Sequence, residues 1–173
     1  MLLMALTLTL WWVAACSPAA TPAAPSGTLV VGLAAESEAM DPYFVYQNAG
    51  QSIMRALFDN LLDRDFDGKI IPGLAESWSI VDDKTLEFKL RKGIKFHNGE
   101  DFDANSVKFS IERMLNPDLK AGGRNQYASI DTVAIQDPFT VRLNLKKTDA
   151  PLIQALAGLQ MLPPNYLKQV GDV

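Results

Sequence analysis

The chain has 173 residues, of which 48% are hydrophobic and 21% are charged, and its formal net charge at pH 7 is −4. This is the composition of an ordinary globular protein. Because the balance is acidic and Lys146-Lys147 is the longest run of lysines, a nucleic-acid-binding surface is not expected. The single cysteine, Cys16, excludes an intrachain disulfide.

Residues 1–15 are almost wholly apolar and lead into Val13-Ala14-Ala15-Cys16. The run is too short to span a bilayer, which needs about 20 residues, but an apolar run followed by small residues is typical of a secretory signal. The last four residues resemble a bacterial lipobox, which implies that Cys16 is lipid-modified. An ordinary free cysteine beside a conventional signal peptide is the alternative. No Lys or Arg precedes the run, which leaves open a start codon further upstream.

We therefore predict a lipoprotein signal peptide over residues 1–16 and a tether over residues 17–27. The tether is rich in Pro and Ala, a composition that favours extended conformations and cannot form a core. Residues 28–173 remain as folding material, which is enough for one domain.

This domain is predicted to begin with a buried strand over residues 28–33, an apolar run with β-branched residues. Asp41-Pro42 marks a turn. A helix is expected to follow, with Asn48 as its cap and Gln51 completing a capping box. Its buried face is expected to carry Ile53, Leu57 and Leu61, with Met54, Phe58 and Leu62 beside them.

The next segment contains Asp63, Asp65, Asp67 and Gly68, whose spacing matches the first half of an EF-hand calcium-binding loop. Such a loop closes with a bidentate Glu at its twelfth position, which here is Leu74. A hairpin turn with solvated acids is therefore favoured, and no metal is predicted.

Residues 84–115 carry the plainest local pattern. Leu86, Phe88 and Leu90 alternate with polar residues, which predicts a strand with one buried face that pairs with Trp78–Val81 in a hairpin. Trp78 is expected to pack in the core. After a turn at Asn98-Gly99, Asp103 is predicted to cap a helix that ends at Asn116-Pro117. The buried stripe of this helix is expected to comprise Ala104, Val107, Ile111, Met114 and Leu115.

The remaining elements are predicted in the same way. A polar loop with glycines is expected over Leu119–Tyr127, and a second hairpin over Ile130–Leu145, with its turn at Asp137-Pro138. A short helix is expected to start at Ala150-Pro151 and another to run over Asn165–Val173.

No set of residues predicts an enzyme. His97 is the only histidine, so a Ser-His-Asp device, a Cys-His device or a histidine-bearing zinc site would have to use it. It lies in a predicted turn. Paired carboxylates such as Glu100/Asp101 and Asp82/Asp83 also lie in turns and are interpreted as solvated. No cofactor is predicted.

Four stretches together carry a family resemblance: Ala39–Pro42, Pro72–Trp78 (PGLAESW), Phe88–Gly93 and Ile94–Gly99 (IKFHNG). In this order they resemble the family 5 extracytoplasmic solute-binding proteins, the peptide, oligopeptide and nickel-type receptors of ATP-binding-cassette (ABC) importers. The resemblance implies a mixed α/β (α+β) fold of the periplasmic-binding-protein-like class II. It also implies that residues 28–173 form the first part of lobe I with its small subdomain, and that the second lobe is absent.

The same resemblance implies a function. The chain is expected to be a monomeric lipoprotein, anchored outside the cytoplasmic membrane, that captures peptides or a similar small solute and delivers them to an ABC permease. The residues that the family places at the cleft are Tyr46, Gln47, Asn48, Arg124, Asn125 and Tyr127. Ordinary loop or capping roles are the alternative for each.

The resemblance also implies a cleft between two lobes that close around the solute by a hinge motion. Because only part of one lobe is expected, we expect the isolated chain to bind peptide weakly or not at all. A small stand-alone lipoprotein with a structural or interaction role is the alternative function.

Overall fold

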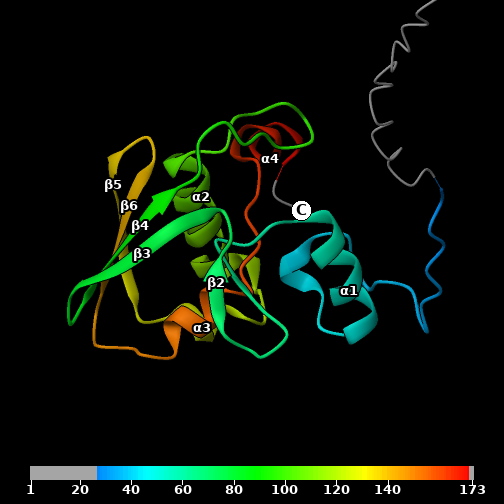
Figure 1. Ribbon diagram of the computed structural model, residues 1–173, viewed down its shortest axis with the longest axis horizontal. Coiled ribbons are helices and arrows are strands. Elements are labelled where there is room, and N and C mark those ends of the chain that lie inside the picture. Colours follow the sequence, from blue (N-terminus) through cyan, green and yellow to red (C-terminus); the bar gives the residue numbers. More distant parts are fainter. Residues whose placement is uncertain (1–26, 172–173) are drawn as a thin grey trace, which may run out of the picture. The chain divides into compact units, whose positions relative to one another are not determined.

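The computed structural model describes residues 27–171 (Figure 1). It divides after Gly32 into two units, which are described separately. The described part of the first unit, residues 27–32, has no regular secondary structure, and Leu29 and Val30 are 86% and 85% exposed. The predicted strand over residues 28–33 is therefore wrong. A strand is stabilised by hydrogen bonds to a neighbour, and no strand among the described residues pairs with this run.

The second unit is built on a four-stranded antiparallel sheet in the order β3-β4-β6-β5. Its strands are β3 (Ala75–Asp82), β4 (Thr85–Leu90), β5 (Ile130–Asp137) and β6 (Thr140–Leu145). Both predicted hairpins are confirmed, and they join through β4 and β6, where Phe88 lies opposite Val141. The alternating residues Leu86, Phe88 and Leu90 are all buried, as predicted.

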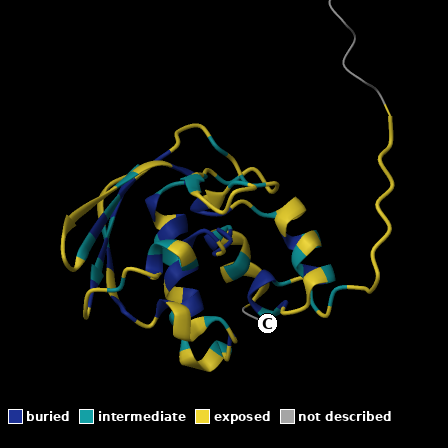
Figure 2. Ribbon diagram, turned by 60° about the horizontal axis from the view of Figure 1, so that its bottom comes forward, coloured by how far each residue is buried: buried dark blue, intermediate teal, exposed yellow. Residues whose placement is uncertain are grey.

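Helix α2 (Ala104–Leu115) covers the apolar face of this sheet, and its buried side faces the strands (Figure 2). Asp103 caps the helix as predicted, because its carboxylate accepts hydrogen bonds from the backbone N–H groups of Asn105 and Ser106. The Ser106 hydroxyl accepts the N–H of Asp103 in return, which completes a capping box. Four of the five predicted stripe residues are buried, and Leu115 is half-buried against the core.

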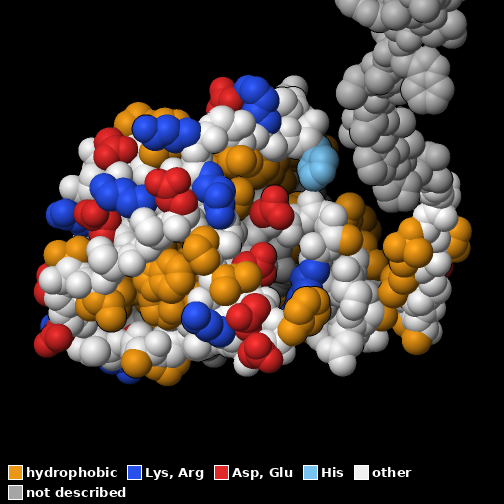
Figure 3. All heavy atoms as spheres, in the orientation of Figure 1, with side chains coloured by type: hydrophobic (Ala, Val, Ile, Leu, Met, Phe, Trp, Pro, Cys, Tyr) orange, Lys and Arg blue, Asp and Glu red, His pale blue; other side chains and the backbone are white. Residues whose placement is uncertain are grey.

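The opposite face of the sheet is polar. Arg142 Nε donates to Glu87 at 2.7 Å, and Lys89 Nζ lies 3.4 Å from the other oxygen of the same carboxylate. Figure 3 shows acidic and basic side chains interspersed over this part of the surface. Trp78 is half-buried and packs against the core, so that prediction is confirmed.

The first helix of this unit, α1 (Asn48–Leu57), differs from its prediction at both ends. Its N-cap is Gln47, which makes no side-chain capping bond, and the Gln51 side chain donates to the Val45 carbonyl instead. The helix ends at Leu57, so Leu61 lies in the following segment. Leu61 follows Leu57 at the helical spacing of four residues, but it lies beyond the end of the helix. Tertiary contacts bury it.

A small antiparallel hairpin follows, formed by β1 (Leu62–Arg64) and β2 (Ile70–Pro72). Its turn is the one predicted at Asp67-Gly68, where Gly68 has a φ of +81°, a conformation that glycine adopts readily. The Asp65 carboxylate accepts the N–H groups of Asp67 and Lys69 at 3.0 and 2.8 Å. The acidic residue Asp65 therefore stabilises the turn.

The chain ends in two short helices, α3 (Leu152–Leu156) and α4 (Pro164–Val170), close to their predicted positions. Short 3-10 helices occur at η1 (Pro42–Phe44), η2 (Pro117–Leu119) and η3 (Arg124–Tyr127), the last two in or beside the predicted loop. The first turn of α4 donates to a distant residue: Asn165 N and Tyr166 N donate to the two oxygens of Glu100 at 3.0 and 2.8 Å.

Candidate functional site

The two segments that the sequence predicts to contact solute meet at Tyr46. Its hydroxyl accepts the backbone N–H of Gly122 at 2.9 Å and donates to the Tyr43 carbonyl at 3.3 Å. A Cβ atom on Gly122 would lie 2.7 Å from Cε1 of Tyr46, so only glycine allows this approach. The loop after Asp41-Pro42 and the turn at residues 121–123 are therefore joined directly.

The first of these segments is anchored on α2 by an ion pair between the buried Arg113 and the half-buried Asp41. Arg113 Nη2 lies 2.6 Å from Asp41 Oδ2, and Nη1 donates to Oδ1 at 3.3 Å. The same guanidinium lies over the Tyr43 ring, 5.1 Å from its centroid, an arrangement that favours a cation–π contact. These contacts hold the start of the loop in one position.

Tyr43 extends this anchor to Gln160, in the segment before α4. Its hydroxyl donates to the carbonyl oxygens of Ser110 and Gln160, at 3.0 and 2.9 Å. Burial raises the pKa of the Tyr43 hydroxyl well above its usual value, because the ionised form would lose its hydration. Tyr43 is thus a neutral donor that links η1, α2 and the segment before α4.

The second segment is held on the other side by Tyr127. This residue is buried, and its hydroxyl donates to the Ala155 carbonyl in α3 at 3.0 Å. Burial raises the pKa of Tyr127 to about 12. Arg124 Nε donates to the Leu115 carbonyl at 2.8 Å, which fixes η3 against the end of α2. The hydrogen bonds of both side chains therefore hold η3 against its neighbouring helices.

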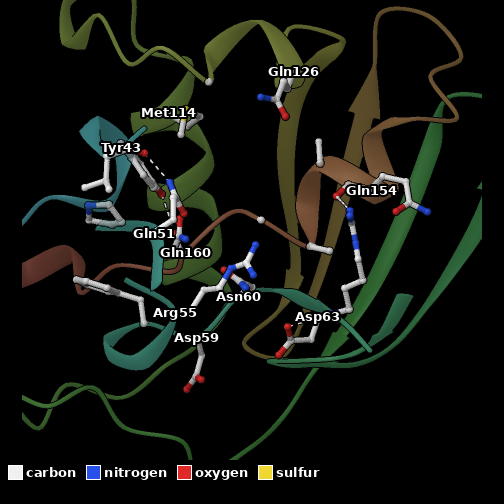
Figure 4. A pocket seen from close by; sticks show the side chains of 18 of the residues that line it. Tyr43, Gln51, Arg55, Asp59, Asn60, Asp63, Met114, Gln126, Gln154 and Gln160 are labelled. Atoms are coloured by element: carbon white, nitrogen blue, oxygen red, sulfur yellow. Dashed lines mark hydrogen bonds between the residues drawn. The ribbon is translucent and has the colours of Figure 1, made fainter. Parts of the chain in front are cut away.

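A hollow of about 830 Å³ lies between these segments. It is bounded by the η1 loop, the end of α1, the β1–β2 hairpin, η3 and α3 (Figure 4). Volumes in this range accommodate small molecules. Many of the side chains that line it are charged or carry amides, among them Arg55, Asp59, Asn60, Asp63, Gln126 and Gln160.

The predicted site residues divide into two groups. Tyr46 and Tyr127 line the hollow, whereas Gln47, Asn48, Arg124 and Asn125 lie in the same two segments without lining it. Gln47 and Asn48 begin α1, and Arg124 and Asn125 belong to η3. Solute contact by all six stays a prediction. Cys16, the predicted lipidation site, lies outside the described residues.

Sequence reasoning missed Asn60 and Gln160, which lie 100 positions apart and form an isolated antiparallel bridge on the wall of the hollow. No local pattern marks them, because neither belongs to a regular strand. Arg55 was also missed, since a cation in the last turn of a helix is common on solvent-exposed faces.

A second, more apolar hollow of about 390 Å³ lies beside the turn that contains His97. Phe58, Ile94, Phe96, Phe102, Met161 and Tyr166 contribute to its wall. His97 is exposed, and it is the pale blue side chain at the surface in Figure 3. Among residues 27–171, no group of three or more His, Cys, Asp or Glu side chains is placed to hold a metal ion.

Comparison with known proteins decides the family. The family model described as "Bacterial extracellular solute-binding proteins, family 5 Middle" matches residues 69–172. The chain belongs to this family. Its members bind solutes and are not enzymes, which agrees with the prediction from the sequence.

Individual relatives agree with this assignment. The glutathione-binding protein GsiB of Salmonella paratyphi A is 34% identical over 160 residues, which cover 91% of this chain and 31% of the relative. The solved structure of AgaA from A. tumefaciens R10, in complex with agropinic acid, superposes with a TM-score of 0.77 and 34% identity, over 81% of this chain and 29% of that one. AppA from Bacillus subtilis, in complex with a nonapeptide, gives a TM-score of 0.71 at 26% identity, over 75% and 26%.

The mixed α/β fold expected from the resemblance is thus confirmed, and the match covers part of each neighbour. The chain spans about a third of the length of the curated relatives it matches. In the part of the chain that the structure describes, no helix is long and apolar enough to cross a membrane.

Proposed function

We propose that this chain is the solute-binding component of an ABC importer, or the first part of one. In this proposal it captures a peptide or a similar small solute outside the cytoplasmic membrane and delivers it to the permease. The observation that carries the proposal is the hollow of about 830 Å³, whose wall includes Tyr46 and Tyr127 from the two segments that the sequence predicts to contact solute. Family membership supports it.

The relatives suggest the range of solutes. Their names and titles record glutathione, agropinic acid and a nonapeptide. All three are polar molecules that carry carboxylates, and the polar wall of the hollow suits such ligands. We take glutathione and the tripeptide Ala-Ala-Ala as the first probes.

In our proposal, residues 28–173 correspond to the beginning of lobe I with its small subdomain. A hollow that stays open on one side cannot exclude water from its solute, so its polar contacts remain weak. We therefore expect dissociation constants in the millimolar range for the chain by itself.

The test is a titration of the ¹⁵N-labelled 173-residue chain by NMR. Either probe, at millimolar concentration, should shift the amide signals of residues 43–47 and 123–127. Gln126→Ala, a change on the wall of the hollow, should weaken the binding, whereas Gln136→Ala, an exposed change on β5, should leave it unaltered. If neither probe shifts these signals, the chain does not bind solute at this site. Micromolar binding would contradict the expectation of an incomplete cleft.

We further propose that Cys16 carries a lipid that anchors a monomeric chain outside the cytoplasmic membrane, with residues 17–27 as the tether. The Val-Ala-Ala-Cys pattern supports this. Expressed in bacteria, the chain should incorporate radiolabelled palmitate and sediment with membranes, and Cys16→Ser should abolish the labelling. Equal labelling of the variant would show that the cysteine is not the acceptor.

A further inference from the structure

Arg55 differs from the other arginines of the described chain. Five arginines each donate to an identified carbonyl or carboxylate: Arg64 to Gln154, Arg91 to Gly73, Arg113 to Asp41, Arg124 to Leu115 and Arg142 to Glu87. Arg55, in the last turn of α1, donates to no group within residues 27–171, and it lines the hollow. Its five N–H donors are therefore available to a molecule that enters.

Asn60, on the same wall, has an unused carboxamide. The residue is 8% exposed, and its Oδ1 atom is buried without a hydrogen-bond partner among the described residues. Its Nδ2 atom donates to no described group either. Oδ1 is an acceptor and could pair only with a donor, whereas Nδ2 is a donor that remains available to an acceptor in the hollow.

The two side chains lie next to each other in the middle of the wall (Figure 4). A guanidinium and a carboxamide NH₂ present donors only, and a carboxylate presents acceptors only. Planar, paired recognition of a carboxylate is the interaction for which arginine is best suited. The pair therefore complements one carboxylate group.

We propose that Arg55 and Asn60 form a carboxylate-binding subsite in the hollow. This inference rests on the proposed function and names the solute class: an acid whose carboxylate enters against the end of α1. The charges nearby define the rest of the solute. Asp59 and Asp63 are exposed and also line the hollow, whereas the Asp65 carboxylate accepts hydrogen bonds from N–H groups of its own turn. A second carboxylate would be repelled there, and an ammonium group would be attracted, so a zwitterion fits best.

The experiment compares two probes that differ only in this group, Ala-Ala-Ala and its C-terminal amide, which keep the same N-terminal ammonium. Binding to the 173-residue chain is measured by NMR at low ionic strength, with the Nε–Hε signal of Arg55 and the side-chain NH₂ signals of Asn60 as local reporters. The free acid should bind about tenfold more tightly than the amide, as for one charge-assisted hydrogen-bonded contact. It should also shift both reporters.

Arg55→Gln should remove this preference. Lys108→Gln is the matched control, because it removes one positive charge from the outer side of α2, away from the hollow, and it should keep the preference. If the amide binds the wild-type chain as tightly as the acid, or if Arg55→Gln keeps the preference, the inference is wrong and the proposed function stands. If neither probe shifts the signals around the hollow, both the inference and the proposed function are wrong.

Discussion

Arg113 and Asp41 form a two-point ion pair across 72 positions of the chain, with N–O distances of 2.6 and 3.3 Å. The Arg113 side chain is 2% exposed and that of Asp41 is 27% exposed. The Arg142–Glu87 pair has a nearly equal distance of 2.7 Å, but its arginine is 41% exposed. The described chain thus contains two ion pairs with similar shortest N–O distances whose arginines differ strongly in exposure.

We predict that Asp41→Asn lowers the free energy of unfolding by about 3 kcal/mol, because it removes the charge of the carboxylate that two nitrogens of the buried Arg113 guanidinium contact. Glu87→Gln should cost clearly less, since water solvates an exposed arginine. Urea unfolding followed by circular dichroism measures both. Equal losses for the two variants would show that burial does not decide the strength of these pairs.

Asp103→Ala should lower the free energy of unfolding by about 1 kcal/mol, because the first turn of α2 loses its side-chain acceptor. Asp103→Asn should retain most of the stability, since its amide oxygen can accept the same N–H groups. The same urea experiment serves. An asparagine variant as unstable as the alanine variant would point to the charge, rather than the hydrogen bonds, as the cause.

Gly122→Ala should separate the two segments that meet at Tyr46. A new Cβ would displace the Tyr46 ring and break the hydrogen bond to its hydroxyl, with an expected loss of about 1 kcal/mol. Hydrogen exchange at the residue 122 amide should accelerate. Gly123→Ala is the control, because the nearest atom to a Cβ there is 3.8 Å away. Unchanged exchange in Gly122→Ala would contradict the contact.

Glu100 should make α4 sensitive to acid. Burial of the carboxylate opposes its ionisation, but hydrogen bonds from Asn165, Asn98 and Tyr166 outweigh this and lower its pKa. A carboxylate whose pKa is lower in the folded state contributes stability above its unfolded pKa, close to 4.5, and loses it as pH falls through the lower, folded pKa.

Glu100→Gln should therefore reduce stability at pH 7 and accelerate amide exchange at Asn165 and Tyr166. Asp82, Glu87 and Asp137 also have lowered pKa values, so the wild-type chain has other acid-sensitive groups. Only the difference between the variant and wild type isolates Glu100. This difference should shrink as pH falls below 4.5. A difference that stays constant from neutral to acid pH would exclude the capping role.

Asn60→Ala should leave the free energy of unfolding within about 1 kcal/mol of wild type, because its side-chain oxygen has no hydrogen bond to lose. Ser110→Ala is the contrasting change, since the Ser110 hydroxyl accepts the Leu162 N–H at 2.9 Å and donates to the Ser106 carbonyl at 2.8 Å. It should cost about 1–3 kcal/mol by leaving a buried N–H unpaired. A large loss for Asn60→Ala would mean that the residue is structural and not kept for a solute.

Local patterns predicted the two hairpins and the helix after them correctly, whereas the pairing of the hairpins through β4 and β6 came only from the structure. The alternation at Leu86, Phe88 and Leu90 and the cap at Asp103 involve residues only a few positions apart, where period and capping chemistry are nearly sufficient. The same method was wrong for residues 28–33. An apolar, β-branched run favours a strand, but the strand that accepts and donates its backbone hydrogen bonds has to come from elsewhere in the chain.

The sequence by itself determined the family, through Pro72–Trp78 and Phe88–Gly99, and with it the two segments expected at the solute. Only the tertiary structure decided what those segments do. It joined Tyr46 to Gly122, used the hydroxyls of Tyr43 and Tyr127 for structural bonds, and placed Arg55 and Asn60 on the wall of the hollow. The reason is physical. Helix and strand preferences act between near neighbours, whereas a binding wall depends on contacts between residues such as Asn60 and Gln160, which only the folded chain brings together.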